Sequence, residues 1–202
     1  RRLHGHCDIA ESVYGESKLL CEKIFQWAEQ IHGIECVFLR YFNACGATEA
    51  YGEAHLPESH LIPLILQVAQ GKREKIYIFG DDYETHDGTC IRDYIHVDDL
   101  ASAHVAAIDT MTEAGVFGTY NLGNGNGYSV KEVIVACEKA VGSGIPFTTG
   151  PRREGDPATL VASSQKARDE LGWTPAHDSI EEIAQSAWNW ECYRRDTLAR
   201  LP

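Results

Sequence analysis

A tyrosine and a lysine stand four residues apart in the segment Tyr14-Gly15-Glu16-Ser17-Lys18. Residues at this spacing leave the same face of a helix, so the phenol and the ammonium group would be neighbours. The lysine charge favours the phenolate and can lower the phenol pKa from about 10 towards neutrality, which would make Tyr14 a proton acceptor or donor. Ordinary amphipathic helices carry the same spacing by accident, so the pair alone predicts no activity.

Helical periodicity places this pair on the first turns of a predicted helix. Apolar residues recur at helical spacing from Val13 to Ile31, with Ser12 as a candidate N-cap and Gly33 as a stop. The continuous apolar run of residues 36–39 then predicts a strand that is buried on both faces of a parallel sheet. A helix followed by such a strand indicates an α/β protein.

Polar chemistry begins where this predicted strand ends, in Arg40-Tyr41-Phe42-Asn43. Ligands of open α/β sheets bind beyond the carboxyl ends of the strands. Asn43 is therefore a candidate hydrogen-bonding group, and Phe42 is a candidate wall of an apolar slot. The alternative is a turn in which Asn43 bonds its own backbone, and the local pattern does not distinguish the two.

The rest of the chain alternates predicted helices with short predicted strands. Capping boxes at Ser129/Glu132 and Ser179/Glu182 support two of the helices. Periodicity and glycine or proline stops predict helices over residues 60–70, 98–111, 130–141, 164–171 and 179–195, and strands over 76–79, 94–97, 119–122, 147–149 and 160–162.

Two aromatic side chains and three arginines are candidates for binding a ligand. Tyr77 and Phe79 share one face of their strand, where they either flank a flat ring such as uracil or belong to the core. Arg92 either pairs with Asp93 or another carboxylate, or binds a phosphate. The pair Arg152-Arg153 lies between glycine and proline residues and is either a second phosphate clamp or a solvated turn.

Composition excludes several classes of partner. The 202 residues carry a formal charge of −12, which argues against nucleic acid and against an anionic membrane surface. An anionic ligand would need a local basic pocket. The seven cysteines are an odd number without a CxxC pair, which indicates reduced thiols and a cytoplasmic protein. No apolar run approaches the roughly 18 to 20 residues that span a bilayer.

The first eleven residues show neither helical nor alternating periodicity, so we expect residues 1–11 to be an unstructured or foreign start. His4, His6 and Cys7 are possible metal ligands, but no fourth ligand is evident nearby. We therefore expect no metal.

Taken together, seven collinear motifs resemble the UDP-glucose 4-epimerase family of the extended short-chain dehydrogenase/reductases. The resemblance runs from about Ser12 nearly to the C-terminus. The motifs are Tyr14-Gly15-Glu16-Ser17-Lys18, Arg40-Tyr41-Phe42-Asn43, His60-Leu61-Ile62-Pro63, Phe79-Gly80-Asp81-Asp82-Tyr83, Asp87-Gly88-Thr89 with Arg92-Asp93-Tyr94-Ile95-His96-Val97, Tyr120-Asn121-Leu122-Gly123 and Pro151-Arg152-Arg153-Glu154-Gly155-Asp156.

The resemblance implies an NAD-dependent reaction on UDP-galactose and UDP-glucose. Tyr14 would take the proton of the sugar 4-hydroxyl while hydride passes to NAD, and a 4-keto intermediate would rotate and accept the hydride on its other face. Lys18 would lower the phenol pKa and hold the nicotinamide ribose, while Tyr41 and Phe42 would contact the cofactor. The residues expected to line the UDP-sugar site are Asn43, His60, Leu61, Tyr77, Phe79, Arg92, Arg153, Asp156 and Leu160, the last of them near the sugar 2-substituent.

The same resemblance implies a domain organisation. Residues 12–48 would be the last part of a Rossmann domain, and 49–202 would form mainly the UDP-sugar domain, with some segments returning to the Rossmann sheet. The sequence holds neither G-x-G-x-x-G nor G-x-x-G-x-x-G, and the serine or threonine that assists the tyrosine is absent as well. We therefore expect the C-terminal part of such an enzyme, with an apolar surface exposed on the first helix and its strand, weak NAD affinity and little activity by itself.

Further expectations concern the complete protein and the rival functions. The resemblance implies a homodimer for the complete protein. The first alternative is another NAD-dependent nucleotide-sugar epimerase, dehydratase or decarboxylase, which would differ around Asn43 and Arg92. The second is a non-catalytic nucleotide-sugar-binding or subunit-interaction module.

Overall fold

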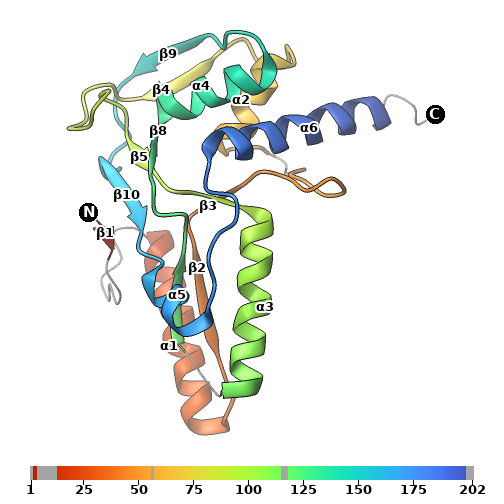
Figure 1. Cartoon of the computed structure of the whole chain (residues 1–202). Helices are drawn as coiled ribbons and strands as arrows, with labels where there is room; N and C mark the ends of the chain where they lie inside the picture. The colour runs from red at the N-terminus through yellow and green to blue at the C-terminus, as the bar shows by residue number, and fades with distance from the viewer. Residues whose placement is uncertain (1, 4–12, 56, 115–117, 199–202) are drawn as a thin grey trace.

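The structure is a computed structural model, and it describes residues 2–3, 13–55, 57–114 and 118–198. Helices and short strands alternate along the chain (Figure 1). The helices are α1 (Val13–His32), α2 (Leu61–Ala69), α3 (Val97–Ala114), α4 (Val130–Val141), α5 (Gln165–Leu171) and α6 (Ile180–Leu198). The strands are β1 (Arg2–Leu3), β2 (Val37–Tyr41), β3 (Asn43–Cys45), β4 (Ile76–Phe79), β5 (Ile91–Arg92), β6 (Tyr94–His96), β7 (Gly118–Leu122), β8 (Tyr128–Ser129), β9 (Phe147–Gly150) and β10 (Thr159–Ala162).

Parallel pairing joins strands that are far apart in the sequence, as the α/β expectation requires. The pairs are β2 with β7, β3 with β6 and β4 with β9, and a further sheet has the order β1-β10-β5-β8, in which only β8 is antiparallel to its neighbour. After β2 the chain changes partner. The Phe42 N–H bonds the Leu122 carbonyl at the end of β7, and the next N–H, of Asn43, bonds the Asp93 carbonyl beside β6.

Two hydrophobic clusters lie at opposite ends of the molecule. Figure 1 shows α2, α4, β4 and β9 together at one end, with α6 beside them, and α1, α3 and α5 around β2 at the other. The first cluster packs α2, β4, α4 and α6 against each other, and the second packs α3, β7 and α5. Adjacent residues of β6 serve both, because Tyr94 lies in the first cluster and Ile95 in the second.

Helix α1 leaves most of its apolar residues in solvent. Leu19 is its one buried residue, whereas Ile24, Trp27 and Ile31 are 63–67% exposed. The predicted exposure of an apolar surface on this helix is confirmed. Such a contiguous apolar face is typical of a surface that packs against another polypeptide segment.

The predicted helices and strands are present, with their ends shifted by up to three residues, and two differences are informative. Strand β3 was not predicted because it follows β2 after one residue. The capping box at Ser129 forms both of its hydrogen bonds. At Ser179 the hydroxyl accepts the Glu182 N–H (3.4 Å), but the Glu182 carboxylate bonds His177 Nδ1 at 2.7 Å. The Glu182 carboxylate is therefore directed to the His177 side chain outside the helix, and not to the Ser179 N–H, which would be the second hydrogen bond of a capping box.

The N-terminal segment differs from the expectation at two residues. Arg2 and Leu3 form β1, which pairs in parallel with Val161 and Ala162 of β10. The expectation of an unstructured start is therefore wrong at these two positions, because backbone pairing needs no apolar periodicity. Residues 4–12, which include the possible ligands His4, His6 and Cys7, lie outside the described residues. None of the described helices is long and apolar enough to cross a membrane.

Candidate functional site

A cavity of about 950 Å³ lies among α2, β3, β4, β6 and α6. It collects residues that the sequence scatters over more than a hundred positions. Eight of the nine predicted substrate residues line it, namely Asn43, His60, Leu61, Tyr77, Phe79, Arg92, Arg153 and Asp156.

Two guanidinium groups supply positive charge to one wall of this cavity. Arg92 on β5 donates to the Asp156 carboxylate and to the Ile91 carbonyl (2.7 Å), so it pairs with a carboxylate other than the neighbouring Asp93. The Arg153 guanidinium lies 3.9 Å from the centre of the Phe79 ring, as in a cation–π contact. Guanidinium groups bind phosphate oxygens in a bidentate manner, so this wall suits an anionic ligand.

Asp93 fixes the strand ends behind this wall. Its carboxylate is fully buried and accepts the backbone N–H groups of Asn124 (2.9 Å), Gly125 (3.0 Å) and Ala162 (3.0 Å). Burial raises the pKa of Asp93 and outweighs these three bonds, which favour the charged form. The carboxylate thereby joins β6 to the ends of β7 and β10, from which the wall is built.

Tyr77 and Phe79 form an aromatic face of the cavity. Strand β4 alternates, with Ile76 and Ile78 in the core and both aromatic side chains partly exposed on the other face. The two rings meet edge to face with centroids 4.9 Å apart, so they form one continuous wall, and no slot lies between them. A Cβ at Gly150 would lie 1.4 Å from the Tyr77 hydroxyl oxygen, so this ring position requires glycine there.

Asn43 and Leu160 lie at neighbouring strand ends. The Asn43 amide nitrogen donates to the Asp93 carbonyl at 2.9 Å across the β3–β6 pair, so the expected alternative, a turn closed on its own backbone, is wrong. Leu160 pairs in register with Arg92 but does not line the cavity. Residues in register project from the same face of a sheet, so Leu160 lies next to the basic wall.

His60 stands at the start of α2 beside a buried acid. Its Nδ1 lies 2.8 Å from Glu58 Oε1, and the same oxygen accepts the backbone N–H groups of Ser59 and His60 at 2.7 Å each. Burial opposes ionisation of Glu58, but these hydrogen bonds outweigh it and lower the pKa of Glu58. His60 keeps 55% of its side chain exposed and remains accessible from the cavity.

Tyr14 and Lys18 lie together but outside the lining of the cavity. Tyr14 is 73% exposed on the first turn of α1, and the Lys18 ammonium nitrogen lies 5.0 Å from the centre of its ring. The predicted helical neighbourhood of phenol and ammonium group is therefore present. In Figure 1, the end of α1 at which the helix begins is the end nearer to β10.

The predicted cofactor residues Tyr41 and Phe42 follow at the carboxyl end of β2. The Tyr41 hydroxyl lies 2.7 Å from His104 Nε2, and His104 Nδ1 lies 2.7 Å from the Leu100 carbonyl. Only a protonated Nδ1 can bond a carbonyl, so in the neutral ring Nε2 accepts the tyrosine proton. Phe42 is partly buried, and it lies at the point where the backbone changes its pairing partner from β7 to β6.

Sequence reasoning missed the contribution of α6. Trp190 and Glu191 line the cavity, Glu191 accepts a hydrogen bond from Gln70 (2.7 Å), and the Trp190 indole donates to the Glu53 carbonyl (3.1 Å). A Cβ at Gly52 would lie 2.4 Å from the Trp190 ring, so this glycine allows the loop to approach α6. Helix α6 reads as an ordinary amphipathic helix, and no local signal places it at a ligand site.

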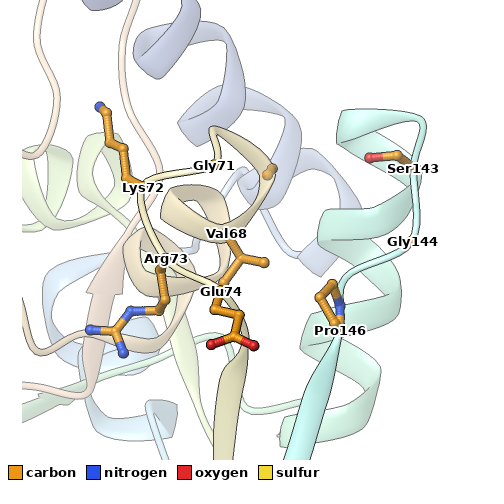
Figure 2. Close-up of a pocket in the computed structure, with 9 residues that line it drawn as sticks. Val68, Gly71, Lys72, Arg73, Glu74, Ser143, Gly144 and Pro146 are labelled. Carbon is orange, nitrogen blue, oxygen red and sulfur yellow. The ribbon is translucent and has the colours of Figure 1, made fainter.

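A second hollow of about 500 Å³ lies between the end of α2 and the turn before β9. Figure 2 shows Lys72 and Arg73 extending away from Ser143 and Pro146 on the opposite side. Its polar groups therefore do not converge, and it lacks the arrangement expected of a small-molecule site.

Comparison with known proteins places the chain in a family. Residues 4–123 match the model of the NAD dependent epimerase/dehydratase family. The chain belongs to this family. The family's UDP-glucose 4-epimerase from Halalkalibacterium halodurans is 55% identical over 90% of this chain, and the one from Lacticaseibacillus casei is 51% identical over 90%. The chain spans about half of these relatives (55% and 56%), and it aligns with their C-terminal part.

Solved structures of family members agree with the fold. A crystal structure of UDP-glucose 4-epimerase matches with a TM-score of 0.87 and 52% identity, covering 91% of this chain and 56% of that one. The UDP-glucose 4-epimerase from Bifidobacterium longum, in complex with NAD+ and UDP, matches with a TM-score of 0.83 and 45% identity, covering 91% and 55%. The predicted Rossmann-like α/β fold of the extended dehydrogenase/reductase type is confirmed.

Proposed function

We propose that this chain carries the UDP-sugar site of a UDP-glucose 4-epimerase, which interconverts UDP-galactose and UDP-glucose with NAD. One observation carries the proposal: eight residues expected at a UDP-sugar site line a single cavity of about 950 Å³. Relatives that are named UDP-glucose 4-epimerases and are 51–55% identical support it.

The lining residues suggest how the nucleotide sugar is held. Arg92 and Arg153 meet the diphosphate, which gives an acidic protein the local basic wall that such an anion needs. Tyr77 and Phe79 offer the uracil ring an aromatic face. Asn43 and His60 supply polar contacts, and Leu160 borders the sugar 2-substituent.

The exposed start of α1 suggests the proton chemistry. Tyr14 takes the proton of the sugar 4-hydroxyl and returns it to the same oxygen once carbon 4 is inverted, while the Lys18 ammonium group lies beside the phenol ring. NAD, when bound, supplies the acceptor and donor of hydride at carbon 4. Tyr14, Lys18, Tyr41 and Phe42 fit the nicotinamide and its ribose, because all four lie at the start of α1 or at the carboxyl end of β2.

The two hydrophobic clusters support an assignment of the chain segments to two domains. Residues 12–48 are assigned to a Rossmann domain and 49–202 mainly to the UDP-sugar domain. The second cluster joins α3, β7 and α5, which fits segments that return from the later part to the Rossmann sheet. The 202 residues hold no glycine-rich pyrophosphate turn, so NAD affinity is expected to be weak.

Two further assignments concern the complete protein. A homodimer is supported by the exposed apolar residues of α1 and α3, among them Ile24, Trp27 and Ile108. A cytoplasmic location is supported by the six cysteines of the described residues, all of which are free thiols.

The test measures UDP binding and epimerisation separately. The purified chain is titrated with UDP by calorimetry and is then assayed for conversion of UDP-galactose with NAD, alone and after adding the dinucleotide-binding half of a relative. We expect UDP binding by the chain alone, and turnover only with the added half. Turnover without it, or NAD retained stoichiometrically on purification, would contradict the expected weak NAD affinity. Absence of UDP binding would overturn the site itself.

Product analysis separates the alternatives. A dehydratase or decarboxylase of the same family would release a keto sugar or a shortened sugar, whereas an epimerase returns the two UDP-hexoses. A non-catalytic module would bind UDP under every condition without turnover, including with the added half.

A further inference from the structure

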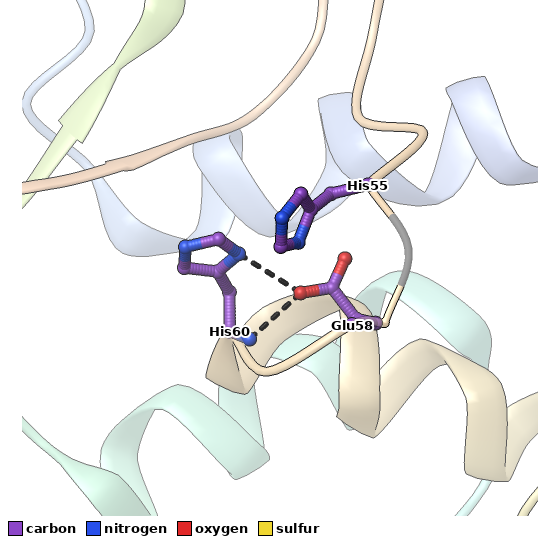
Figure 3. Close-up of side chains that lie close together, drawn as sticks. All are labelled: His55, Glu58 and His60. Atoms are coloured by element: carbon purple, nitrogen blue, oxygen red, sulfur yellow. Dashed lines mark hydrogen bonds and ion pairs between the residues drawn. The ribbon is translucent and has the colours of Figure 1, made fainter.

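The loop before α2 brings together two imidazoles and a carboxylate. One ligand atom from each of His55, Glu58 and His60 lies within 4.8 Å of the other two. Figure 3 shows both histidine rings facing the Glu58 carboxylate. Pro57 restricts the backbone just before Glu58, and His60 is the N-cap of α2, so the segment that carries Glu58 and His60 is held at the start of this helix.

We propose that His55, Glu58 and His60 form a binding site for a transition metal of the zinc class. Two imidazoles and one carboxylate with an open fourth position form an established zinc ligand set, in which bond lengths of about 2.0–2.2 Å place ligand atoms about 3.4 Å apart. His60 Nδ1 and Glu58 Oε1 are now 2.8 Å apart, so small side-chain rotations reach that geometry. The fourth position is open to water or an anion.

Burial and charge favour this cluster. The Glu58 side chain is only 6% exposed, so the site offers a carboxylate oxygen that is largely shielded from water. In the described part of the chain, neither ring nitrogen of His55 has a hydrogen-bond partner, which leaves its lone pair available. The formal charge of −12 attracts cations towards the molecule.

A second group of possible ligands, His96, Asp98 and His177, is less suitable. His96 is buried, its Nε2 lies 3.1 Å from the Ser186 hydroxyl, and its Nδ1 accepts the Asp98 N–H at 3.1 Å. Both nitrogens of that ring are therefore occupied. This second group of possible ligands therefore serves as an internal control in the experiment.

The first cluster also touches the proposed nucleotide-sugar site. His60, together with Ala54 and Ser59, lines the cavity, so the metal would sit at its rim. The proposal does not depend on the epimerase reaction, because its readout is metal binding by the chain itself.

The test titrates the untagged, metal-free chain with Zn²⁺ against a chromophoric chelator, and with Co²⁺ while recording the visible bands of a tetrahedral complex. We expect one site per chain, and a loss of affinity of tenfold or more in His55→Ala and in Glu58→Gln. His177→Ala tests the second cluster, His32→Ala is the matched control on the exposed end of α1, and a triple His4→Ala, His6→Ala, Cys7→Ala variant tests the N-terminal segment. All three should bind as the unaltered chain does.

Three results would overturn the proposal: no stoichiometric Zn²⁺ binding, unchanged affinity in His55→Ala, or loss of the site in His177→Ala or in the N-terminal variant. Circular dichroism checks that each variant is folded. His55→Gln, with a side chain of similar size at an exposed position, repeats the test if the alanine variant unfolds.

Discussion

The Arg92 guanidinium bonds the Asp156 carboxylate, although 64 residues separate them in the sequence. The parallel pairing of β5 with β10 makes this contact, because it sets Arg92 opposite Leu160, four residues after Asp156. The ion pair holds the guanidinium at the cavity wall before any ligand arrives. Pre-positioned charge of this kind reduces the ordering cost of binding an anion.

Replacing Arg92 should therefore weaken UDP binding strongly. In Arg92→Ala the Asp156 carboxylate loses its partner and faces the diphosphate, so both lost attraction and new repulsion act. We expect UDP affinity to fall by about 30-fold or more, which corresponds to roughly 2 kcal/mol or more. Calorimetry on the chain measures this. Arg195→Ala, which removes an exposed arginine near the end of α6, is the matched control, and equal losses in the two variants would refute the role of Arg92.

Tyr14 should matter for turnover and not for UDP binding, because it does not line the cavity. Tyr14→Phe removes only the phenolic oxygen, and we expect kcat of the chain supplemented with a dinucleotide-binding half to fall by about 10² to 10⁴-fold. The UDP dissociation constant should stay the same. Tyr193→Phe makes the same chemical change on α6 and should leave both values unaltered. A Tyr14→Phe enzyme with normal kcat would exclude Tyr14 as the acid/base.

Gly150 should control the aromatic wall. In Gly150→Ala the new methyl group would occupy the position of the Tyr77 hydroxyl, so the ring must swing away. Because a stacked base is worth about 1–3 kcal/mol, we expect UDP affinity to fall by about tenfold. Adding Tyr77→Ala to Gly150→Ala should cause little further loss if the ring is the cause. Additive losses in the double variant would show that the glycine acts elsewhere.

The Asp93 carboxylate should stabilise the fold in a pH-dependent manner. Asp93→Asn places an amide NH₂ where backbone N–H groups need an acceptor, so we expect a loss of roughly 2–3 kcal/mol in the free energy of unfolding. The folded-state pKa of Asp93 is raised, so the stabilisation from this group is fully present at low pH and declines as pH rises through the folded pKa.

The advantage of the unaltered chain over Asp93→Asn should therefore be larger at pH 5 than at pH 7. Urea unfolding of both chains at the two pH values measures this difference. Comparing the pair cancels the opposite contributions of carboxyls whose pKa is lowered, such as Asp87 and Glu181. A difference that grows towards pH 7 would contradict the burial of an ionisable Asp93.

Local pattern predicted much of the fold because periodicity reports burial directly. The alternation of β4, the glycine stop after α1 and the capping box at Ser129 were all readable in this way. The partners of β2 and β3 were not, because each lies more than 40 residues away and pairing leaves no local trace. Strands of two or three residues, such as β5, are too short to show a period.

The residues of the candidate site likewise differ in whether a local pattern or only long-range packing reveals them. Asn43 and Arg92 could be named as candidates because polar groups at strand ends contrast with the apolar run beside them, but the local pattern left their roles open and only the family resemblance favoured ligand binding. Trp190 and Glu191 could not, because their place in the cavity depends on how α6 packs against α2 and the loop at Gly52. The ion pair of Arg92 with Asp156 likewise required the register of two strands.

Strand β6 makes the folding of the two hydrophobic clusters interdependent. Tyr94 and Ile95 are consecutive, and a slip of one residue in the β3–β6 register would exchange the faces that they occupy. The β3–β6 register that packs Tyr94 into the first cluster therefore also fixes the packing of Ile95 in the second. The two ends of the molecule should accordingly unfold in one cooperative transition.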